Sequence, residues 1–322
     1  MKHTAVSAVP AVLLATIVTG AACAQDDDTT TGAERTIAAL GDLRFVVAGG
    51  YARFLDTDFD AGGGEVGVDR VMASFSVSGE ANENVRWSVG VDWEGGWYDF
   101  GATGTLANAA GGTPWDAVQS TAILARLDYR LGERWRASAG FLVGFAGEND
   151  ASAGESITFG GLLGASYSFS EELNLGAGVF LSSRIEDDIL VIPQILVDWR
   201  PCKEFRLSNF AGPEAFPGGA GLEGIWQISD EFELALGGRY TYRRFRLDDT
   251  GAPARANGVG VDQGLPVWLR ATMRAKCGAR IDLVGGFQFM GEMSLEDSAG
   301  VELAKEDVEA APFVGVFASW RF

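Results

Sequence analysis

Residues 85–94 read V-R-W-S-V-G-V-D-W-E, and every second side chain in this stretch is large and apolar. On an extended chain, one face carries Val85, Trp87, Val89, Val91 and Trp93. The opposite face carries Arg86, Ser88, Gly90, Asp92 and Glu94. Because successive side chains of a strand point to opposite sides of the sheet, this period of two predicts a β-strand with one apolar and one polar face.

The same alternation recurs from residue 43 to the last residue, in about 14 runs separated by turn residues. The expected strands are residues 43–54, 66–78, 85–99, 118–131, 135–146, 156–169, 173–184, 188–200, 205–211, 220–229, 232–246, 265–275, 279–294 and 311–322. No stretch after residue 24 is apolar for long enough to form a transmembrane helix. The chain is therefore predicted to be all-β.

The connections between these runs alternate in length. Short turns follow every second strand, whereas longer segments at 55–65, 100–117, 247–264 and 295–310 lie at the other end. Aromatic residues cluster beside the short turns, as a membrane–water interface selects; examples are Trp87, Tyr129, Trp135 and Trp199. This pattern predicts a transmembrane antiparallel up-and-down β-barrel of about 14 strands. The alternative is a soluble secreted sandwich or barrel with its apolar face turned inward.

The first residues have the form of a secretory signal. Lys2 precedes an apolar stretch, and Ala22-Cys23-Ala24 fits the small-residue cleavage rule, so residues 1–24 are expected to be removed. A lipoprotein signal cut before Cys23 is the alternative. Residues 25–42 are acidic and Thr-rich and are expected to form a flexible leader. The barrel is then expected to occupy residues 43–322.

Charge and histidine content limit the function. The formal net charge is −19, and it becomes about −20 when Lys2 is removed with the signal. Such acidity argues against a nucleic-acid partner, which selects basic patches. His3 is the only histidine in the chain, and it leaves with the signal.

The last strand carries a recognisable pattern. Its alternate positions are apolar or aromatic and it ends on a ring: Val314, Val316, Ala318, Trp320 and Phe322. This pattern resembles the C-terminal recognition strand of bacterial outer-membrane β-barrel proteins. The resemblance implies that the barrel assembly machinery of a Gram-negative outer membrane reads this strand and that outer-membrane lipid surrounds the barrel.

Two further stretches, V-I-P-Q-I-L-V-D-W-R at 191–200 and G-G-R-Y-T-Y-R-R-F-R-L-D-D at 237–249, resemble a family of uncharacterised outer-membrane barrels. That resemblance brings no known activity. Outer-membrane barrels that are enzymes resemble this chain in fold but rely on a histidine, which the mature chain lacks, so a protein that is not an enzyme is expected. No dedicated cofactor is expected either. Asp92 and Glu94 share a face that is expected to lie beside Arg126; a cross-strand ion pair is the simpler interpretation, and an acid–base pair is the other.

The inward faces carry the candidate functional residues. Charges expected to line the lumen are Arg126, Arg239, Arg243, Arg270, Asp92, Glu94 and Glu223. The arginines form either a basic stripe that filters solutes or a set of neutralised pairs that stiffen a filled barrel. A passive porin-like channel for small solutes is the favoured function. A closed structural or adhesive barrel is the alternative.

Acidic loops and cysteines add two smaller expectations. Asp56, Asp58, Asp60 and Glu65 lack the glycine and glutamate of an EF-hand loop, so solvated loop charge with loosely bound Ca²⁺ or Mg²⁺ is expected rather than a dedicated site. Cys202 and Cys277 lie in turns about four strands apart, too distant for an intrachain disulfide unless a turn folds beneath the barrel.

Overall fold

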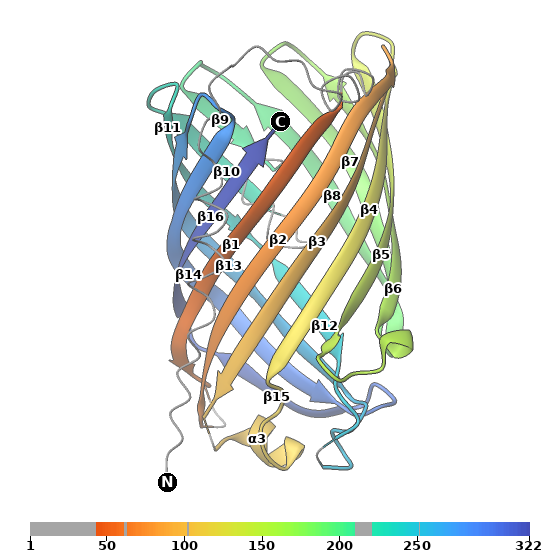
Figure 1. The fold of residues 1–322 in the computed structure, drawn as a ribbon, viewed down its shortest axis with the longest axis vertical. Helices are drawn as coiled ribbons and strands as arrows, with labels where there is room; N and C mark the ends of the chain where they lie inside the picture. The colour runs from red at the N-terminus through yellow and green to blue at the C-terminus, as the bar shows by residue number, and fades with distance from the viewer. Residues whose placement is uncertain (1–42, 61–62, 102, 210–220, 251) are drawn as a thin grey trace, which may run out of the picture.

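The chain folds into a closed antiparallel β-barrel (Figure 1). The computed structural model describes residues 43–60, 63–101, 103–209, 221–250 and 252–322; the expected signal peptide and acidic leader lie outside these residues. The sheet contains 16 strands, of which 14 close into the barrel wall. The prediction of an all-β, 14-stranded barrel is therefore confirmed.

The wall strands follow one another around the barrel in chain order. They are β1 (Arg44–Asp58), β2 (Glu65–Asn82), β3 (Val85–Phe100), β4 (Ala117–Leu131), β5 (Trp135–Glu148), β6 (Ile157–Ser168), β7 (Leu173–Arg184), β8 (Asp187–Trp199), β9 (Phe205–Ser208), β10 (Gly221–Gln227), β11 (Phe232–Arg239), β13 (Val259–Arg274), β14 (Ala279–Glu296) and β16 (Ala311–Arg321). Two more strands, β12 (Thr241–Arg246) and β15 (Glu302–Val308), continue β11 and β16 respectively beyond a break.

The first and last strands close the barrel. β1 pairs with β16 in antiparallel register from Val46 opposite Arg321 to Phe54 opposite Phe313. At the end of this seam the amide of Phe322 donates to the carbonyl of Phe45 over 2.9 Å, and the amide of Phe45 donates back over 3.3 Å. The seam leaves β1 and β16 without an unpaired edge.

The outer face of the wall is apolar. Large hydrophobic side chains point away from the lumen on every side, with Ile195 at 74% and Leu269 at 67% exposure, and others such as Leu127, Phe141, Leu163 and Val314 are also exposed. A water-soluble barrel would bury these side chains, whereas a transmembrane barrel turns them toward lipid. The transmembrane assignment follows from this orientation, and the soluble alternative is excluded. None of the described helices is long and apolar enough to cross a membrane.

Three of the longer predicted connections contain strand. Residues 55–58 extend β1, residues 259–264 extend β13, and residues 302–308 form β15. Charged side chains crowd β15, which reads E-L-A-K-E-D-V, and they hide the alternation that marks the other strands. The long segment at 100–117 contains a short helix, α3 (Thr105–Ala110).

Four strands bend at one height near the end that carries the longer connections. β11 gives way to β12 at Tyr240, the β13–β14 register shifts between Gln263 and Leu265, and Met290 adopts a φ of 50° where β14 leaves β16 and meets β15. Beyond this line the four segments form a small sheet, here called the cover sheet: residues 241–246, 259–264, 291–296 and 302–308. Arg246 of this sheet pairs with Gly147 of β5, so the cover sheet reaches across the mouth of the barrel.

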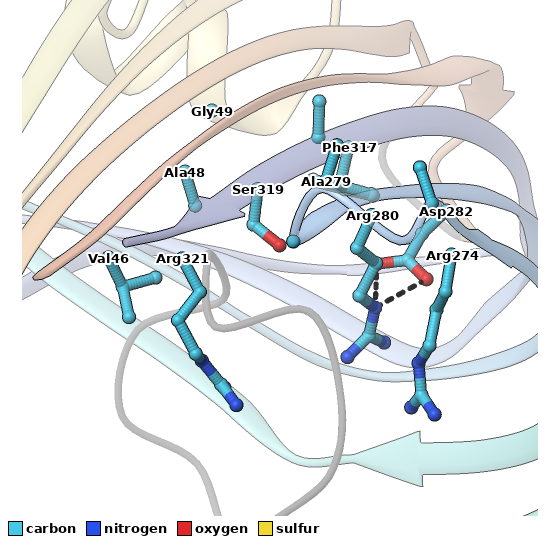
Figure 2. A pocket seen from close by; sticks show the side chains of 13 residues that line it. Val46, Ala48, Gly49, Arg274, Ala279, Arg280, Asp282, Phe317, Ser319 and Arg321 are labelled. Atoms are coloured by element: carbon cyan, nitrogen blue, oxygen red, sulfur yellow. Dashed lines mark hydrogen bonds and ion pairs between the residues drawn. The ribbon is translucent and has the colours of Figure 1, made fainter. Parts of the chain in front are cut away.

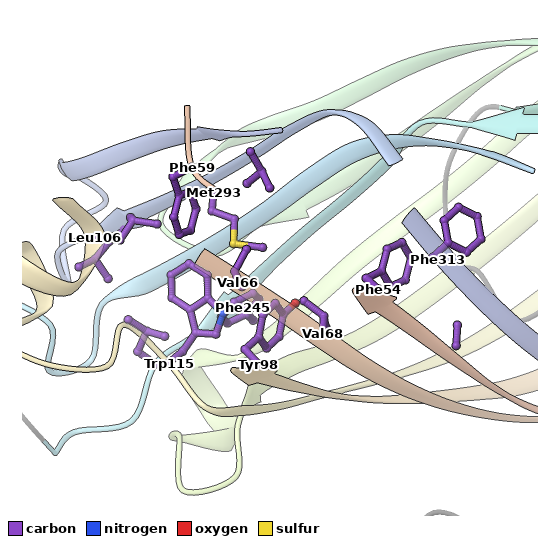
Figure 3. Close-up of a cluster of buried hydrophobic side chains, with 14 of the residues drawn as sticks. Phe54, Phe59, Val66, Val68, Tyr98, Leu106, Trp115, Phe245, Met293 and Phe313 are labelled. Carbon is purple, nitrogen blue, oxygen red and sulfur yellow. The ribbon is translucent and has the colours of Figure 1, made fainter. Parts of the chain in front are cut away.

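An apolar core lies beneath the cover sheet. Trp115 has no exposed surface, and its ring makes edge contacts with Phe100 and Phe245 at centroid distances of 5.1 and 5.3 Å. Leu106 of α3 belongs to the same cluster, as Figure 3 shows. This packing is unusual for a lumen and closes part of the mouth from inside.

Candidate functional site

A first cluster of buried charges links the wall to the cover sheet. Arg70 of β2 donates to Glu94 of β3 over 2.9 Å and to Asp262 of β13 over 2.5 Å. Arg243 of β12 approaches the same Glu94 at 2.7 Å, and the hydroxyl of Tyr98 donates to Asp262 over 2.8 Å. These side chains are largely shielded from water, so each charge depends on its partner.

A second cluster centres on Arg270 of β13. Its guanidinium makes a two-pronged contact with Glu223 of β10 at 2.9 and 2.5 Å and reaches Glu233 of β11 at 2.7 Å. Asp282 of β14 lies 3.3 Å away, and the indole of Trp268 donates to Glu223 over 2.9 Å. Arg270 itself is 1% exposed, so it holds strands together inside the wall and does not face a passage.

The remaining predicted lumen charges lie apart from one another. Arg126 pairs with Asp128 on its own strand at 2.9 Å. The expectation that Asp92 and Glu94 flank Arg126 is wrong, because the β3–β4 register places Arg126 opposite Ser88 and Glu94 opposite Ser120. Asp92 is half-buried on the inner face of β3.

Arg239 is half-buried on β11. It is close enough to interact electrostatically with Glu223, Glu94 and Arg243, and so stands between the two clusters. The lumen charges predicted from sequence are thus divided between one pair on β4, two buried clusters, and Asp92 and Arg239.

The wall formed by β4 to β8 is apolar on its inner face. Strands β4 to β8 carry apolar side chains on their inner as well as their outer faces. The inward ones, here called the apolar lumen face, are half-buried and not sealed: Leu124, Leu142, Leu162, Phe180, Ile192 and Leu196. Inward side chains keep exposed surface only where the lumen beside them is unfilled. The lumen is therefore packed on the side of β1 to β3 and β13 to β16, and accessible along β4 to β8.

A pocket opens on the inner face at the short-turn end, between β1, β13, β14 and β16. It has a volume of about 380 Å³, and its lining includes Arg274, Arg280, Arg321, Asp282 and Ser319. Figure 2 shows the three guanidinium groups pointing to the same side, while Asp282 lies against Arg280 at 3.0 Å.

Apolar side chains also line this pocket. The ring of Phe317 lies over Gly50, where a Cβ atom would come within 2.0 Å of it. Arg274 and Asp282 occupy inward positions in the alternation of β13 and β14. Arg280 and Arg321 were not identified as site residues from the sequence, although their alternation with Asp282 and Ser319 carries that information.

Ion pairs also tie the cover sheet and its loops to the far wall. Arg255, in the loop after β12, donates to both oxygens of Glu148 on β5 at 2.7 and 2.6 Å and to Asp248 at 2.5 Å. Arg244 of β12 contacts Glu296 at 2.7 Å and donates to the carbonyl of Ile185 in the β7–β8 turn over 2.5 Å. The mouth at this end is thus held by paired charges on both sides.

Asp248 lies outside the membrane-spanning strands. Partial burial opposes its ionisation, but hydrogen bonds from Arg255 and Thr250 prevail and lower the pKa of Asp248 below its ordinary value. The ionised form is therefore the one that this loop stabilises.

The acidic loops and the thiols have simpler surroundings. Asp56, which was expected in the first long connection, lies in β1 and pairs with Arg53 at 2.6 Å. Across the described ranges, no three His, Cys, Asp or Glu side chains converge as metal ligands. Cys202 is exposed and Cys277 is half-buried, and no disulfide joins these two turns.

No family model matches the sequence, and no curated protein matches it. Several solved outer-membrane barrels are similar in outline. An outer-membrane channel from Pseudomonas putida F1 is 13% identical, with 86% of this chain and 95% of that chain covered and a TM-score of 0.46. The Pseudomonas putida toluene transporter TodX is 14% identical, with 91% and 94% covered and a TM-score of 0.43. The NanC porin is 9% identical, with 86% and 98% covered and a TM-score of 0.37. At these TM-scores none of them identifies a solute for this chain.

Proposed function

We propose that this protein is a passive, porin-like channel of the Gram-negative outer membrane, not an enzyme, that admits small solutes through a charged lumen. The observation that supports this most directly is the apolar lumen face, whose inward side chains keep exposed surface along β4 to β8. Half-buried charges at inward positions, namely Asp92, Arg126 and Arg239, line the lumen as well. A passage with both apolar and charged surfaces suits small solutes of mixed polarity.

The surroundings of the channel follow from the same fold. The exposed apolar exterior is proposed to contact outer-membrane lipid, and the strand that ends on Phe322 is proposed to be read by the barrel assembly machinery. Loose binding of Ca²⁺ or Mg²⁺ by the acidic loops, with no other cofactor and no nucleic-acid partner, completes the proposal.

A closed structural or adhesive barrel is the second candidate. It is favoured by the cover sheet and by the apolar core around Trp115, which together obstruct part of the mouth. The two candidates differ in one measurable property, because only a channel passes solute.

Conductance in planar bilayers, with swelling of liposomes in small sugars, separates the two candidates. Two neighbouring residues of β6 provide matched variants, since Ser166 points into the lumen and Ala165 points toward lipid. Ser166→Trp is expected to lower the single-channel conductance to roughly half or less by narrowing the passage, whereas Ala165→Trp leaves it unchanged. If the wild-type protein neither conducts nor swells liposomes, the channel is refuted and the closed barrel is supported.

A further inference from the structure

Arginine side chains outnumber acidic side chains among the described residues around the pocket at the short-turn end. Four arginines meet here, namely Arg270, Arg274, Arg280 and Arg321, and the acids that face them are Glu223, Glu233 and Asp282. Arg274 contacts Glu233 at 2.7 Å, but Glu233 is already engaged by Arg270 at the same distance. Among these described side chains, the arginines therefore outnumber the acids by one.

Two guanidinium groups retain hydrogen-bonding capacity that points to a missing partner. The Nη2 atom of Arg280 is buried and makes no hydrogen bond within the described residues; a carboxylate oxygen of Glu233 lies 3.9 Å from it. The side chain of Arg321 forms no ion pair with any residue in the described part of the chain. A buried donor without an acceptor is costly, so an anion placed between these groups is stabilised.

The apolar lining of the pocket adds a second requirement. Val46, Ala48 and Phe317 contribute apolar surface to the same pocket as the arginines. The volume of about 380 Å³ lies within the range that accommodates a small organic molecule. An inorganic ion would leave this apolar surface unused, whereas an acid with a compact apolar body would fill both parts of the pocket.

We infer that this pocket is a binding site for a small organic carboxylate, whose carboxylate is held by Arg280 and Arg321 and whose apolar body rests on Phe317. The planar guanidinium fork matches a carboxylate through two parallel hydrogen bonds. The site stands at the short-turn end of the lumen. Small organic carboxylates are then the solute class of the channel, and in that respect the inference rests on the proposed function.

Calorimetric titration of the full-length protein in nanodiscs tests the site with three probes: benzoate, the neutral isostere benzamide, and acetate. Benzoate is expected to bind, with benzamide and acetate each about tenfold weaker or more, because one lacks the charge and the other lacks the ring. Equal binding of benzamide or acetate, or no binding of benzoate, would overturn the assignment.

Variants place the binding in the pocket. Arg321→Gln, alone and with Arg280→Gln, is expected to weaken benzoate binding about tenfold or more. The matched control is Arg130→Gln, which removes an exposed arginine at the short-turn end of β4, outside the pocket. An equal loss in the control would show that only the general charge of the lumen matters. Since Arg321 is exposed, its single variant keeps the test valid if the double variant does not fold.

Failure of the channel and failure of the site give different results. Benzoate binding that depends on Arg321, in a protein that neither conducts nor swells liposomes, would refute the channel and leave the site standing. Conductance without benzoate binding would refute the site and leave the channel standing.

Discussion

The guanidinium of Arg70 on β2 lies 2.5 Å from the carboxylate of Asp262 on β13, although 192 residues separate them in the chain. Three wall strands, β1, β16 and β14, stand between them around the barrel, so the contact is a chord across the lumen. It joins the wall to the β13 segment of the cover sheet.

This contact across the lumen predicts that a single variant lowers the free energy of unfolding more than the double variant does. Arg70→Met leaves Asp262 buried without its cation and is expected to lower the free energy of unfolding by about 3–5 kcal/mol. Arg70→Met with Asp262→Leu removes both charges and is expected to recover a large part of that loss. Urea unfolding in liposomes measures both. Arg86→Met breaks an exposed pair with Glu80 and is expected to cost no more than about 1 kcal/mol. Equal effects at Arg70 and Arg86 would contradict the buried chord.

The core beneath the cover sheet predicts a change in conductance. Trp115→Ala empties a fully buried site and is expected to cost about 3–5 kcal/mol and to loosen the cover sheet. If the mouth limits the current, single-channel conductance rises. Trp97→Ala, which removes an outward ring that is 44% exposed, is the control and is expected to leave the current unchanged. Unaltered conductance in Trp115→Ala would show that the limiting constriction lies elsewhere.

The loop after β12 predicts a pH dependence. Because the pKa of Asp248 is lowered in the folded protein, its contribution to stability is present above the ordinary value of 3.8 and is lost as the pH falls through the lowered pKa. Asp248→Asn is therefore expected to speed hydrogen exchange in residues 248–258 at neutral pH. The difference from wild type should shrink below about pH 4. A difference that is constant with pH would mean that the charge of Asp248 has no part in holding the loop.

The terminal aromatic residue predicts an effect on assembly. Phe322 is 63% exposed, and its ring stacks on Trp320 at a centroid distance of 5.2 Å. Phe322→Ser is expected to reduce the amount of folded barrel in the outer membrane of Gram-negative cells several-fold, measured by heat-modifiable mobility in gels. Phe169→Ser removes another exposed ring beside a short turn and serves as the control. Equal loss in both variants would point to lipid anchoring and not to recognition.

Most of the barrel could be predicted from the order of residues. Alternation at 85–94 and in the other runs identifies the wall strands and which face each side chain occupies, because the side-chain period of a strand is a local property of the backbone. The ends of strands near short turns were also predicted closely. Where charged residues occupy both faces, as in β15, the local signal fails and the strand is visible only through its pairing with β14.

The charged residues show the same division between what local sequence predicts and what depends on strand pairing. The sequence by itself determined that Arg126, Arg243, Arg270 and Glu223 point inward, since each holds its place in an alternating run. Only the tertiary structure decided which charges neutralise one another and which remain: Arg270 with Glu223, Arg70 with Asp262, and Arg321 with no ion pair among the described residues. The physical reason is that direction follows from the backbone of a single strand, whereas pairing depends on the register and curvature that closing 14 strands imposes on all of them together.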